Sequence, residues 1–463
     1  MELNKRIDEL REDLIKSTQE VLRIKSVEDV AVPGKPYGEG VNKALETALN
    51  IAKKLGFKTV NLDGYIGYAE VGEGEEYIGV LGHLDVVPEG EGWLYPPYAA
   101  EIHDGKIYAR GSLDDKGPIM ASLYGLKAVV DSGLSISKKV RVIFGTNEET
   151  GSGEIEHYLK KEKPPILGFT PDAEYPMIFA EKGITIFNLV KDLNIKPSKG
   201  INIKSIKGGL KANMVPEYCE AILETEDGDA IISDAAAFAE RTGFNVRAEV
   251  VDNLVVVKSF GVAAHGSLPQ LGKNAIMQLF AFLENLELGK SDIAEFIIFF
   301  NKNVGMEVDG KSFGIGLKDE ESGKLSFNAG VIDMNEDKVT FILNLRYPVT
   351  NTYEDMMKPF NARIQGTGMR VENMMHQEPL YFPKDHELIK ILQKVYVEQT
   401  HLDATPIAIG GGTYAKEMPN IVAFGPIFPG KPDLDHQVNE YIEVEDLVMN
   451  AKIYAHAIYE LAK

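Results

Sequence analysis

The first residues with chemical potential lie directly after a strongly apolar run. His83 and Asp85 follow YIGVLG at 77–82. Residues two apart in an extended chain project to the same side, so the two side chains can make contact. An imidazole that binds a metal through one nitrogen usually has its other nitrogen held by a carboxylate. The pair therefore suggests a metal ligand with its supporting acid, although a loop histidine beside an incidental aspartate is the commoner explanation for such a pair alone.

More carboxylates and a second histidine follow other apolar runs. They are Asp114 and Asp115 before a glycine, Glu148 and Glu149 after VRVIFGT, Asp172 after PPILGFT, and His436 in DLDH. An aspartate before a helix is commonly just an N-terminal cap. Adjacent carboxylates at the end of a buried strand, however, repel each other unless one is protonated or a cation lies near. Together these sites favour a shared cation over a solvated rim.

Charge balance indicates how many cations such a group would hold. Two divalent cations carry four positive charges, which Asp114, Glu149, Asp172 and one hydroxide would neutralise. His83 and His436 would complete a nitrogen and oxygen ligand set suited to Zn²⁺, and less selectively to Co²⁺ or Mn²⁺. In a two-metal site one carboxylate must bridge the metals. Glu148 would then remain unligated and could act as general base for the bridging water.

The elements that must position these residues alternate between strands and helices. Apolar, strand-like runs at 77–87, 139–149 and 164–173 are separated by helical patterns at 41–56 and 117–133. Near-continuous apolar strands separated by helices predict an α/β fold with a mostly parallel central sheet covered on both faces. Ligands of such sheets bind beyond the carboxyl ends of the strands, where the acids and histidines lie.

From about residue 184 the pattern changes. The chain reads as strand, strand, helix, strand, strand, and residues 325–347 begin a similar unit in which Asn328 is placed like Asn213. These two similar halves predict an inserted α+β domain. Helix and strand alternation returns after about residue 385. We therefore expect one domain formed by 1–182 and 381–463, with 183–380 inserted into it.

Composition excludes several classes of protein. The 463 residues include 49 basic and 70 acidic side chains, a net charge of −21 that disfavours binding to nucleic acid. A single cysteine, Cys219, excludes a disulfide framework and a cysteine zinc knuckle. No apolar run reaches the ~20 residues that span a bilayer, and the first segment lacks the apolar core of a signal peptide. These features predict a cytoplasmic protein that does not bind membranes.

Several motifs together resemble one known family. HLDVVP at 83–88, GSLDDKG at 111–117, the Glu148–Glu149 pair, Asp172 and the late His436 are similar to the M20 family of dinuclear zinc peptidases and deacylases. The resemblance covers essentially the whole chain, including the insertion, which in the family is a lid domain. Length, HLDVVPEGEGW and the duplicated lid resemble the PepV-type dipeptidases most closely.

The resemblance implies a role for each of these residues. His83 and Asp172 would hold one Zn²⁺, Glu149 and His436 the other, and Asp114, followed by a cis peptide in the family, would bridge them. Asp85 would orient His83, and Glu148 would be the general base.

The resemblance also implies roles for residues of the lid. His265 would polarise the scissile carbonyl, Asn213 and Arg346 would contact substrate, and Gly411 and Gly412 would help to seat the substrate carboxylate. Without the resemblance, a lone histidine such as His265 is more often structural, and an arginine in a strand is often simply exposed. No lysine follows the glycines as in a P-loop, so they do not indicate nucleotide binding.

The expected activity is hydrolysis of dipeptides with free termini, with a metal-bridging hydroxide as nucleophile. One alternative is an N-acyl-amino-acid deacylase of the acetylornithine or succinyl-diaminopimelate type, with the same metal site. A second is a metal-dependent peptide-binding protein without activity, against which the unligated Glu148 argues. Two lid halves in one chain would substitute for a lid dimer, which predicts a monomer.

Overall fold

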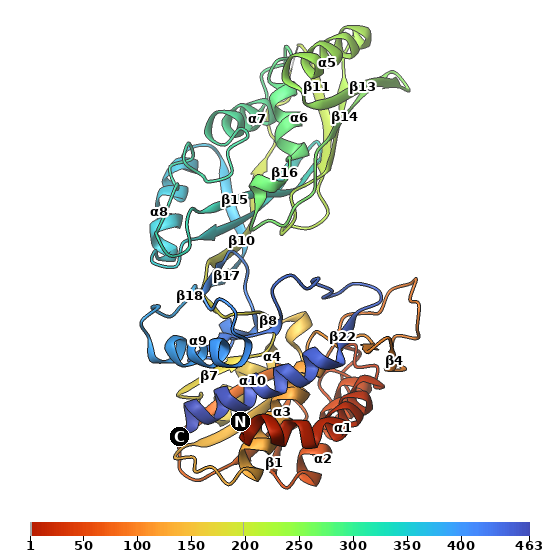
Figure 1. The fold of residues 1–463 in the computed structure, drawn as a ribbon. Coiled ribbons are helices and arrows are strands. Elements are labelled where there is room, and N and C mark those ends of the chain that lie inside the picture. The colour runs from red at the N-terminus through yellow and green to blue at the C-terminus, as the bar shows by residue number, and fades with distance from the viewer. Residues whose placement is uncertain (1, 198) are drawn as a thin grey trace. The chain divides into compact units, whose positions relative to one another are not determined.

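The computed structural model describes residues 2–197 and 199–463, which form two compact units (Figure 1). Unit 1 consists of the chain up to Phe179, Phe382–Ile407 and Thr413–Lys463, and unit 2 of Ala180–Tyr381 and Ala408–Gly412. Unit 2 is thus an insertion in the sequence of unit 1. Within the described residues, no helix is both long and apolar enough to cross a membrane.

The main sheet, most of whose strands belong to unit 1, is mixed. Its described strands are β1 (Lys58–Leu62), β2 (Ile66–Val71), β3 (Tyr77–His83), β6 (Lys139–Gly145), β7 (Leu167–Thr170), β9 (Ile178–Glu181), β18 (Leu380–Tyr381), β19 (Ile407–Ile409) and β20 (Ile421–Ala423). They are ordered β1-β2-β6-β3-β7-β20-β9-β18, with β19 also paired to β9. The central strands β6, β3, β7 and β20 run parallel, whereas β1, β2, β9 and β18 pair antiparallel at the two sides.

The helices of unit 1 explain why its central strands are apolar throughout. They are α1 (Glu2–Leu22), α2 (Glu39–Lys54), α3 (Lys116–Asp131), α4 (Gly153–Lys161), α9 (Glu387–Thr400) and α10 (Val444–Ala462). Successive side chains of a strand point to opposite faces, and every residue of β3 is buried, so both faces of the sheet are covered there. The predicted α/β class is confirmed, with parallel pairing limited to the centre of the sheet.

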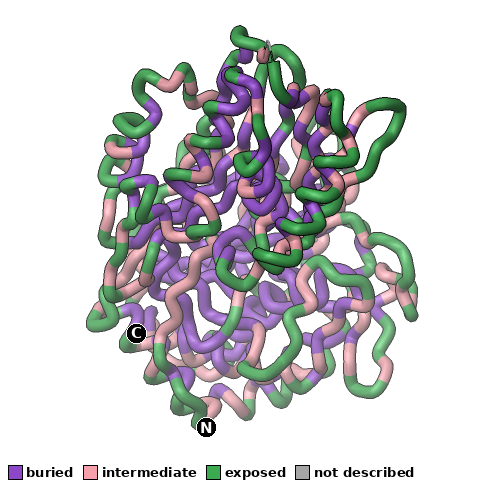
Figure 2. Tube along the Cα trace, turned by 90° about the horizontal axis from the view of Figure 1, so that it is seen from above, coloured by how far each residue is buried: buried purple, intermediate pink, exposed green. Residues whose placement is uncertain are grey.

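Two small sheets carry the loops of unit 1. The first joins β4 (Glu101–His103), β5 (Lys106–Tyr108) and β22 (Tyr441–Glu443), and the second joins β8 (Ala173–Glu174) and β21 (Pro426–Ile427). Short 3₁₀ turns, η1 (Glu148–Thr150) and η3 (Tyr414–Lys416), follow β6 and precede β20. Figure 2 shows buried chain in the interior and exposed chain in the outer loops.

Unit 2 is an antiparallel sheet with helices. The described elements are β10 (Gly183–Asp192), β11 (Asn202–Gly208), β12 (Tyr218–Glu224), α5 (Gly228–Thr242), β13 (Asn245–Val251), β14 (Leu254–Phe260), η2 (Pro269–Leu271), α6 (Ala275–Leu283), α7 (Asp292–Asn303), β15 (Ser326–Met334), β16 (Lys338–Tyr347), α8 (Tyr353–Ile364) and β17 (Met369–Gln377). The strand order is β13-β14-β12-β11-β15-β16-β10-β17, and each neighbouring pair is antiparallel.

This order contains the two expected halves. In the first half, β11 and β12 precede α5, and β13 and β14 complete four strands. In the second half, β15 and β16 precede α8 and β17, but the strand between β16 and β17 is β10, from the start of the unit. The halves join where β11 meets β15, with Gly208 opposite Ile332. The inserted α+β unit is therefore confirmed. The sheet of its second half is completed by β10, which comes from the start of the unit.

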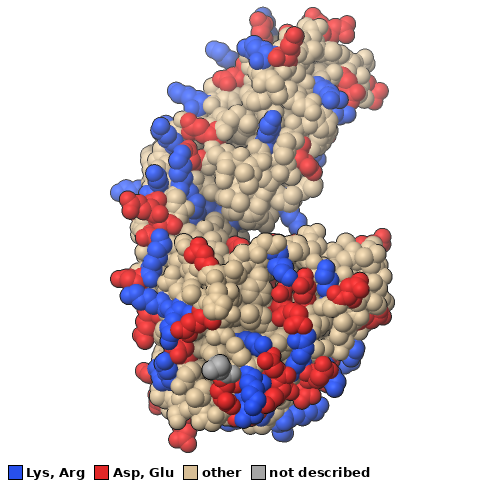
Figure 3. Space-filling view, in the orientation of Figure 1, with Lys and Arg blue, Asp and Glu red and all other residues tan. Residues whose placement is uncertain are grey.

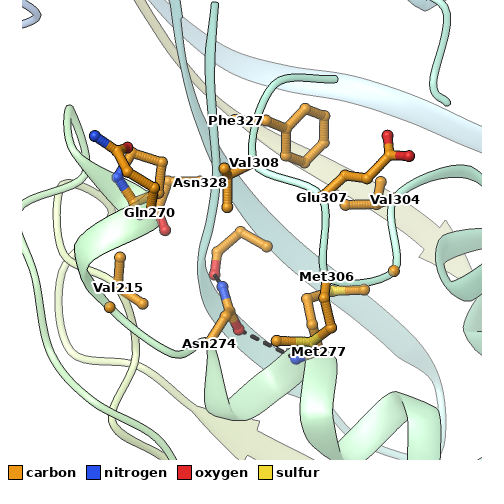
Figure 4. Close-up of a pocket in the computed structure, with 14 residues that line it drawn as sticks. Val215, Gln270, Asn274, Met277, Val304, Met306, Glu307, Val308, Phe327 and Asn328 are labelled. Atoms are coloured by element: carbon orange, nitrogen blue, oxygen red, sulfur yellow. Dashed lines mark hydrogen bonds between the residues drawn. The ribbon is translucent and has the colours of Figure 1, made fainter. Parts of the chain in front are cut away.

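A cavity of about 280 Å³ lies within unit 2, beside the start of α6 (Figure 4). Asn274 caps α6, since its Oδ1 accepts from the N–H groups of Ile276 and Met277 and its Nδ2 donates to the carbonyl of Ala329. Val215, Phe327 and Asn328 line the same cavity.

Candidate metal centre

His83 is the last residue of β3 and is completely buried. Its Nδ1 lies 3.0 Å from the backbone carbonyl of Asp85, whereas the Asp85 carboxylate is 3.5 Å from it. Because a carbonyl only accepts, Nδ1 carries a proton, so Nε2 is the nitrogen that can bind a cation. That nitrogen lies 2.9 Å from Oδ1 of Asp114. Two acceptors at this distance require a proton or a cation between them.

Asp114 lies between the two histidines. Its Oδ1 faces Nε2 of His83, and its Oδ2 is 3.1 Å from Nε2 of His436. The peptide bond to Asp115 is cis, as the resemblance implies. Asp115 is directed elsewhere, because its Oδ2 accepts from the backbone N–H of His83. Of the two adjacent aspartates, Asp114 alone has one oxygen toward each imidazole, as a bridging ligand would require.

Glu148 and Glu149 form the turn η1 after β6. Their backbone N–H groups donate to the two carboxylate oxygens of Asp85, over 3.2 and 3.1 Å. Asp85 thus contacts the His83 ring through its carbonyl and fixes the glutamate turn through its side chain. Oε2 of Glu149 lies 3.0 Å from Nε2 of His436. Asp85 therefore connects two of the predicted ligands in a manner that its spacing from His83 did not indicate.

Asp172 follows β7 and completes the group. Its Oδ2 is 3.8 Å from Nε2 of His83. Ligand atoms of His83, Asp114 and Glu149 lie within 4.8 Å of one another, and so do those of His83, Glu148 and Asp172. The structure thus brings together all seven residues that the sequence suggested for this centre, and places Glu148 as close to His83 and Asp172 as a ligand would be.

The electrostatics of the group are those of an unbalanced cluster of acids. Burial, reinforced by the charge of Asp172, raises the pKa of Glu148 well above its usual value. Burial alone would also raise the pKa of Asp114, but hydrogen bonds from His436 and His83 outweigh it and lower that pKa. The same contacts, led by Asp114 and then Glu149, raise the pKa of His436 to about 11. Protons on the imidazoles thus offset the acids.

These residues fit divalent cations by the chemistry of their donors. Imidazole nitrogens and carboxylate oxygens converge at hydrogen-bond distances, and the imidazole protons occupy the positions that cations would take. Neutral histidine and carboxylate together are typical zinc ligands, and also accept Co²⁺ or Mn²⁺.

One residue of this centre was not expected from the sequence. Glu440 is completely buried and accepts hydrogen bonds from the backbone N–H groups of Gly111, Leu113 and Asp114. It stands four residues after His436, just before β22. That short spacing in HQVNE was the only available signal, since its partners lie more than three hundred positions away.

In unit 2, His265 belongs to a chain of polar contacts. Its Nδ1 lies 2.6 Å from Oγ of Ser267, and the carbonyl of Ser267 accepts from Oγ of Ser326. Burial, and next the charge of Arg346, lowers the pKa of His265. The glycine loop is close, because a Cβ on Gly410 would meet Cβ of Ser267 at 2.8 Å. The imidazole of His265 is therefore held next to this loop.

Arg346 lies in β16 opposite Ser326 of β15 and is 4% exposed. Its Nη1 donates to the carbonyl of Gly410 over 2.7 Å, and its Nε donates to Oδ1 of Asn344. Among the described residues no carboxylate pairs with it, and burial lowers its pKa to about 10. A buried guanidinium without an acid is costly, so its environment is suited to a carboxylate from outside the chain. Gly411 and Gly412 continue the same loop.

Asn213 is exposed between β11 and β12, and its backbone pairs with the His265 segment. The N–H of Gly266 donates to the carbonyl of Asn213 over 2.7 Å, and Met214 forms a bridge with His265. Nδ2 of Asn328 donates to the carbonyls of Ala212 and Met214, on either side of Asn213. Unit 2 thus brings Asn213, His265, Arg346 and the glycine loop into one group.

Comparison with known proteins identifies the sequence family. The model described as "Peptidase family M20/M25/M40" matches residues 79–460. A Bacillus subtilis relative, "Putative dipeptidase YtjP", is 42% identical over 458 residues, 98% of each chain. A Staphylococcus epidermidis relative described as "Putative dipeptidase" is 36% identical over 460 residues, again 98% of each chain.

Solved structures share the fold at low sequence identity. Aminoacylhistidine dipeptidase from Vibrio alginolyticus matches with a TM-score of 0.60 and 13% identity over 96% of each chain. Human carnosine dipeptidase 1 matches with a TM-score of 0.56 and 15% identity, covering 100% of this chain and 99% of that one.

Proposed function

Because the chain belongs to peptidase family M20/M25/M40, and is therefore a peptide hydrolase, we propose that it cleaves dipeptides with free termini at the two-histidine centre of unit 1. The names of the relatives support dipeptides as the substrate class. The observation that carries the proposal is the convergence in unit 1 of ligand atoms from His83, Asp114 and Glu149, and from His83, Glu148 and Asp172.

Two divalent cations would be held by the residues of the centre. His83 and Asp172 would bind one, Glu149 and His436 the other, and Asp114 both. Zn²⁺ suits this donor set best, with Co²⁺ and Mn²⁺ as substitutes. When bound, such cations lower the pKa of a water molecule and polarise a carbonyl.

Glu148 is the general base of the proposed reaction. No hydrogen-bond donor among the described residues engages its carboxylate, and its surroundings favour uptake of a proton. It would accept the proton of the attacking water and deliver it to the leaving amine. Asp85 would hold Glu148 in place through the backbone of η1.

Residues of unit 2 would bind the rest of the substrate. Oγ–H of Ser267 donating to Nδ1 would leave the proton of His265 on Nε2, available to the oxyanion that develops from the scissile carbonyl. Arg346 would bind the free carboxylate, assisted by N–H groups of Gly411 and Gly412. Asn213 would contact the substrate backbone. The chain would act as a monomer, because its two similar lid halves would substitute for a lid dimer.

The test compares substrates that differ at one end. Purified enzyme should hydrolyse free dipeptides much faster than C-terminally amidated dipeptides, tripeptides or N-acetyl amino acids, and should contain two equivalents of metal by elemental analysis. A chelator should abolish activity, and Zn²⁺, Co²⁺ or Mn²⁺ should restore it. Preference for N-acetyl amino acids would instead identify a deacylase, and peptide binding without hydrolysis would identify a binding protein.

A further inference from the structure

A buried carboxylate outside the metal ligands is surrounded by donors from a single loop. Oε1 of Glu440 accepts from the backbone N–H groups of Leu113 and Asp114, over 2.8 and 3.2 Å. Oε2 accepts from the N–H of Gly111 over 3.0 Å and from Nη1 of Arg110 over 2.7 Å. An ionised carboxylate is acceptor-only, so this is the form that satisfies all four donors.

The backbone around Glu440 is fixed independently of this side chain. β22 follows directly and pairs with β5, with Tyr441 opposite Tyr108. The ladder continues by one further bond, from the N–H of Ala109 to the carbonyl of Glu440. The Glu440 side chain therefore starts from a rigid position and reaches into the loop that carries Asp114.

Glu440 connects the two loops whose side chains meet at the centre. His436 lies four residues before it, and the Asp114 N–H is one of its donors. At the centre, Oδ2 of Asp114 and Nε2 of His436 are 3.1 Å apart. Glu440 thus connects the Asp114 loop to the segment that carries His436.

Arg110 compensates the charge of the buried Glu440 carboxylate. The ion pair between Arg110 and Glu440 is buried on both sides, at 2% and 0% exposure. The guanidinium also lies over the ring of Trp93, 5.5 Å from its centroid. A buried carboxylate that is paired and hydrogen-bonded in this way can stay ionised. Removing one partner of the ion pair leaves the other as an uncompensated buried charge.

We propose that Glu440 is a positioning residue that sets the spacing of Asp114 and His436 and thereby the affinity for the cation they share with Glu149. The inference rests on the proposed function, in that it assumes the two-cation centre. Glu440 contacts neither cation nor substrate and acts through the backbone of the Asp114 loop. Groups that support metal ligands in this way typically change metal affinity or activity ~10–100-fold when altered.

The experiment compares Glu440→Gln with Glu443→Gln, a matched change on β22 whose carboxylate pairs with the half-exposed Lys431. In Glu440→Gln an amide N–H₂ would face N–H donors. We expect the cation of Asp114, His436 and Glu149 to bind ~10–100-fold less tightly, measured by metal titration of the folded protein, with a changed Co²⁺ absorption spectrum. In the metal-free protein, amides of Gly111, Leu113 and Asp114 should exchange hydrogen faster. Glu443→Gln should match the wild type throughout.

Glu440→Asp keeps the charge and should restore part of the affinity, which also covers the case in which Glu440→Gln does not fold. Unchanged cation affinity and Co²⁺ spectrum in a folded Glu440 variant, with only a lower melting temperature, would overturn the inference and leave the proposed function intact. A wild-type enzyme that binds no pair of cations would instead overturn the proposed function.

Discussion

The candidate groups of the two units carry charges of opposite sign. The group in unit 1 has an excess of carboxylates, and the group in unit 2 has a guanidinium without an acid. In unit 1, several carboxylates converge on two histidines, and these contacts raise the pKa of His436. In unit 2, the guanidinium of Arg346 is buried against a carbonyl and an amide oxygen, with no acid among the described residues. The first group is suited to cations, and the second is suited to an anion.

Because the two groups differ in charge, we expect each to bind a different partner. Metal cations satisfy the first group, and the free carboxylate of a peptide satisfies the second. On the face of the protein drawn in Figure 3, by contrast, acidic and basic side chains are interspersed. Substitutions in one group should therefore weaken the step that this group performs and leave the binding partner of the other group unaffected.

The largest effect is expected from Glu148→Gln, since it removes the proposed base without removing a ligand. Turnover should fall ~10²–10⁴-fold, the usual contribution of a general base. Metal content, measured by elemental analysis, should stay at the wild-type value. Glu156→Gln, at an exposed position of α4, serves as the control. Wild-type turnover in Glu148→Gln would exclude this residue as the base.

His265→Ala should have the next largest effect. Loss of one donor to a developing oxyanion typically costs ~10²–10³-fold in kcat. Because His265 belongs to unit 2, neither metal content nor the Co²⁺ spectrum should change. His157→Ala removes a histidine of unit 1 that stacks on Tyr65 and should have no effect on kcat. An unchanged kcat in His265→Ala would make this histidine structural.

Arg346→Met tests whether the guanidinium binds the free carboxylate of the substrate. Hydrogen bonds to charged groups contribute ~1.5–3 kcal/mol, so kcat/KM for free dipeptides should fall ~10–150-fold. C-terminally amidated dipeptides, which carry no carboxylate, should be hydrolysed equally by both enzymes. An equal loss for both substrates would show that Arg346 supports the glycine loop instead of binding the carboxylate.

The smallest effect is expected from Asn328→Ala. This change removes the hydrogen bonds to the carbonyls beside Asn213. Loss of partners for buried groups costs ~1–3 kcal/mol of unfolding free energy, which urea denaturation would measure. The catalytic effect should stay below that of His265→Ala, because Asn328 acts only through the Asn213 backbone. A loss of kcat as large as that of His265→Ala would assign Asn328 a direct role.

Features encoded locally were predictable from the sequence. The run before His83 is apolar because both faces of β3 are covered, and the acids after β6 and β7 had to lie at one edge because parallel strands end together. This local logic predicted which side chains meet in unit 1. The roles of Asn213 and Arg346 depended on family resemblance, because nothing in their own surroundings in the sequence points to a ligand.

Features that depend on distant pairing were not predictable. Periodicity does not reveal that β10 inserts between β16 and β17, or that strands at both sides of the main sheet run antiparallel. The Asp85 carboxylate lies 3.5 Å from the imidazole, as expected, but it also accepts from two backbone N–H groups of η1, which its spacing from His83 did not reveal. Glu440 was missed for the same reason: its partners are backbone groups far along the chain.

The strand pairing at the ends of the insertion has a consequence for engineering. Ala180 is opposite Tyr381, and Ile184 is opposite Gln377, so the chain departs and returns along adjacent antiparallel strands. The whole insertion thus replaces what would otherwise be the tip of a hairpin. A two-residue turn closing that hairpin would yield a truncated scaffold that keeps its metal ligands while losing the guanidinium. The glycine loop, which belongs to unit 2 but lies at 408–412, would stay in this scaffold without its Arg346 partner.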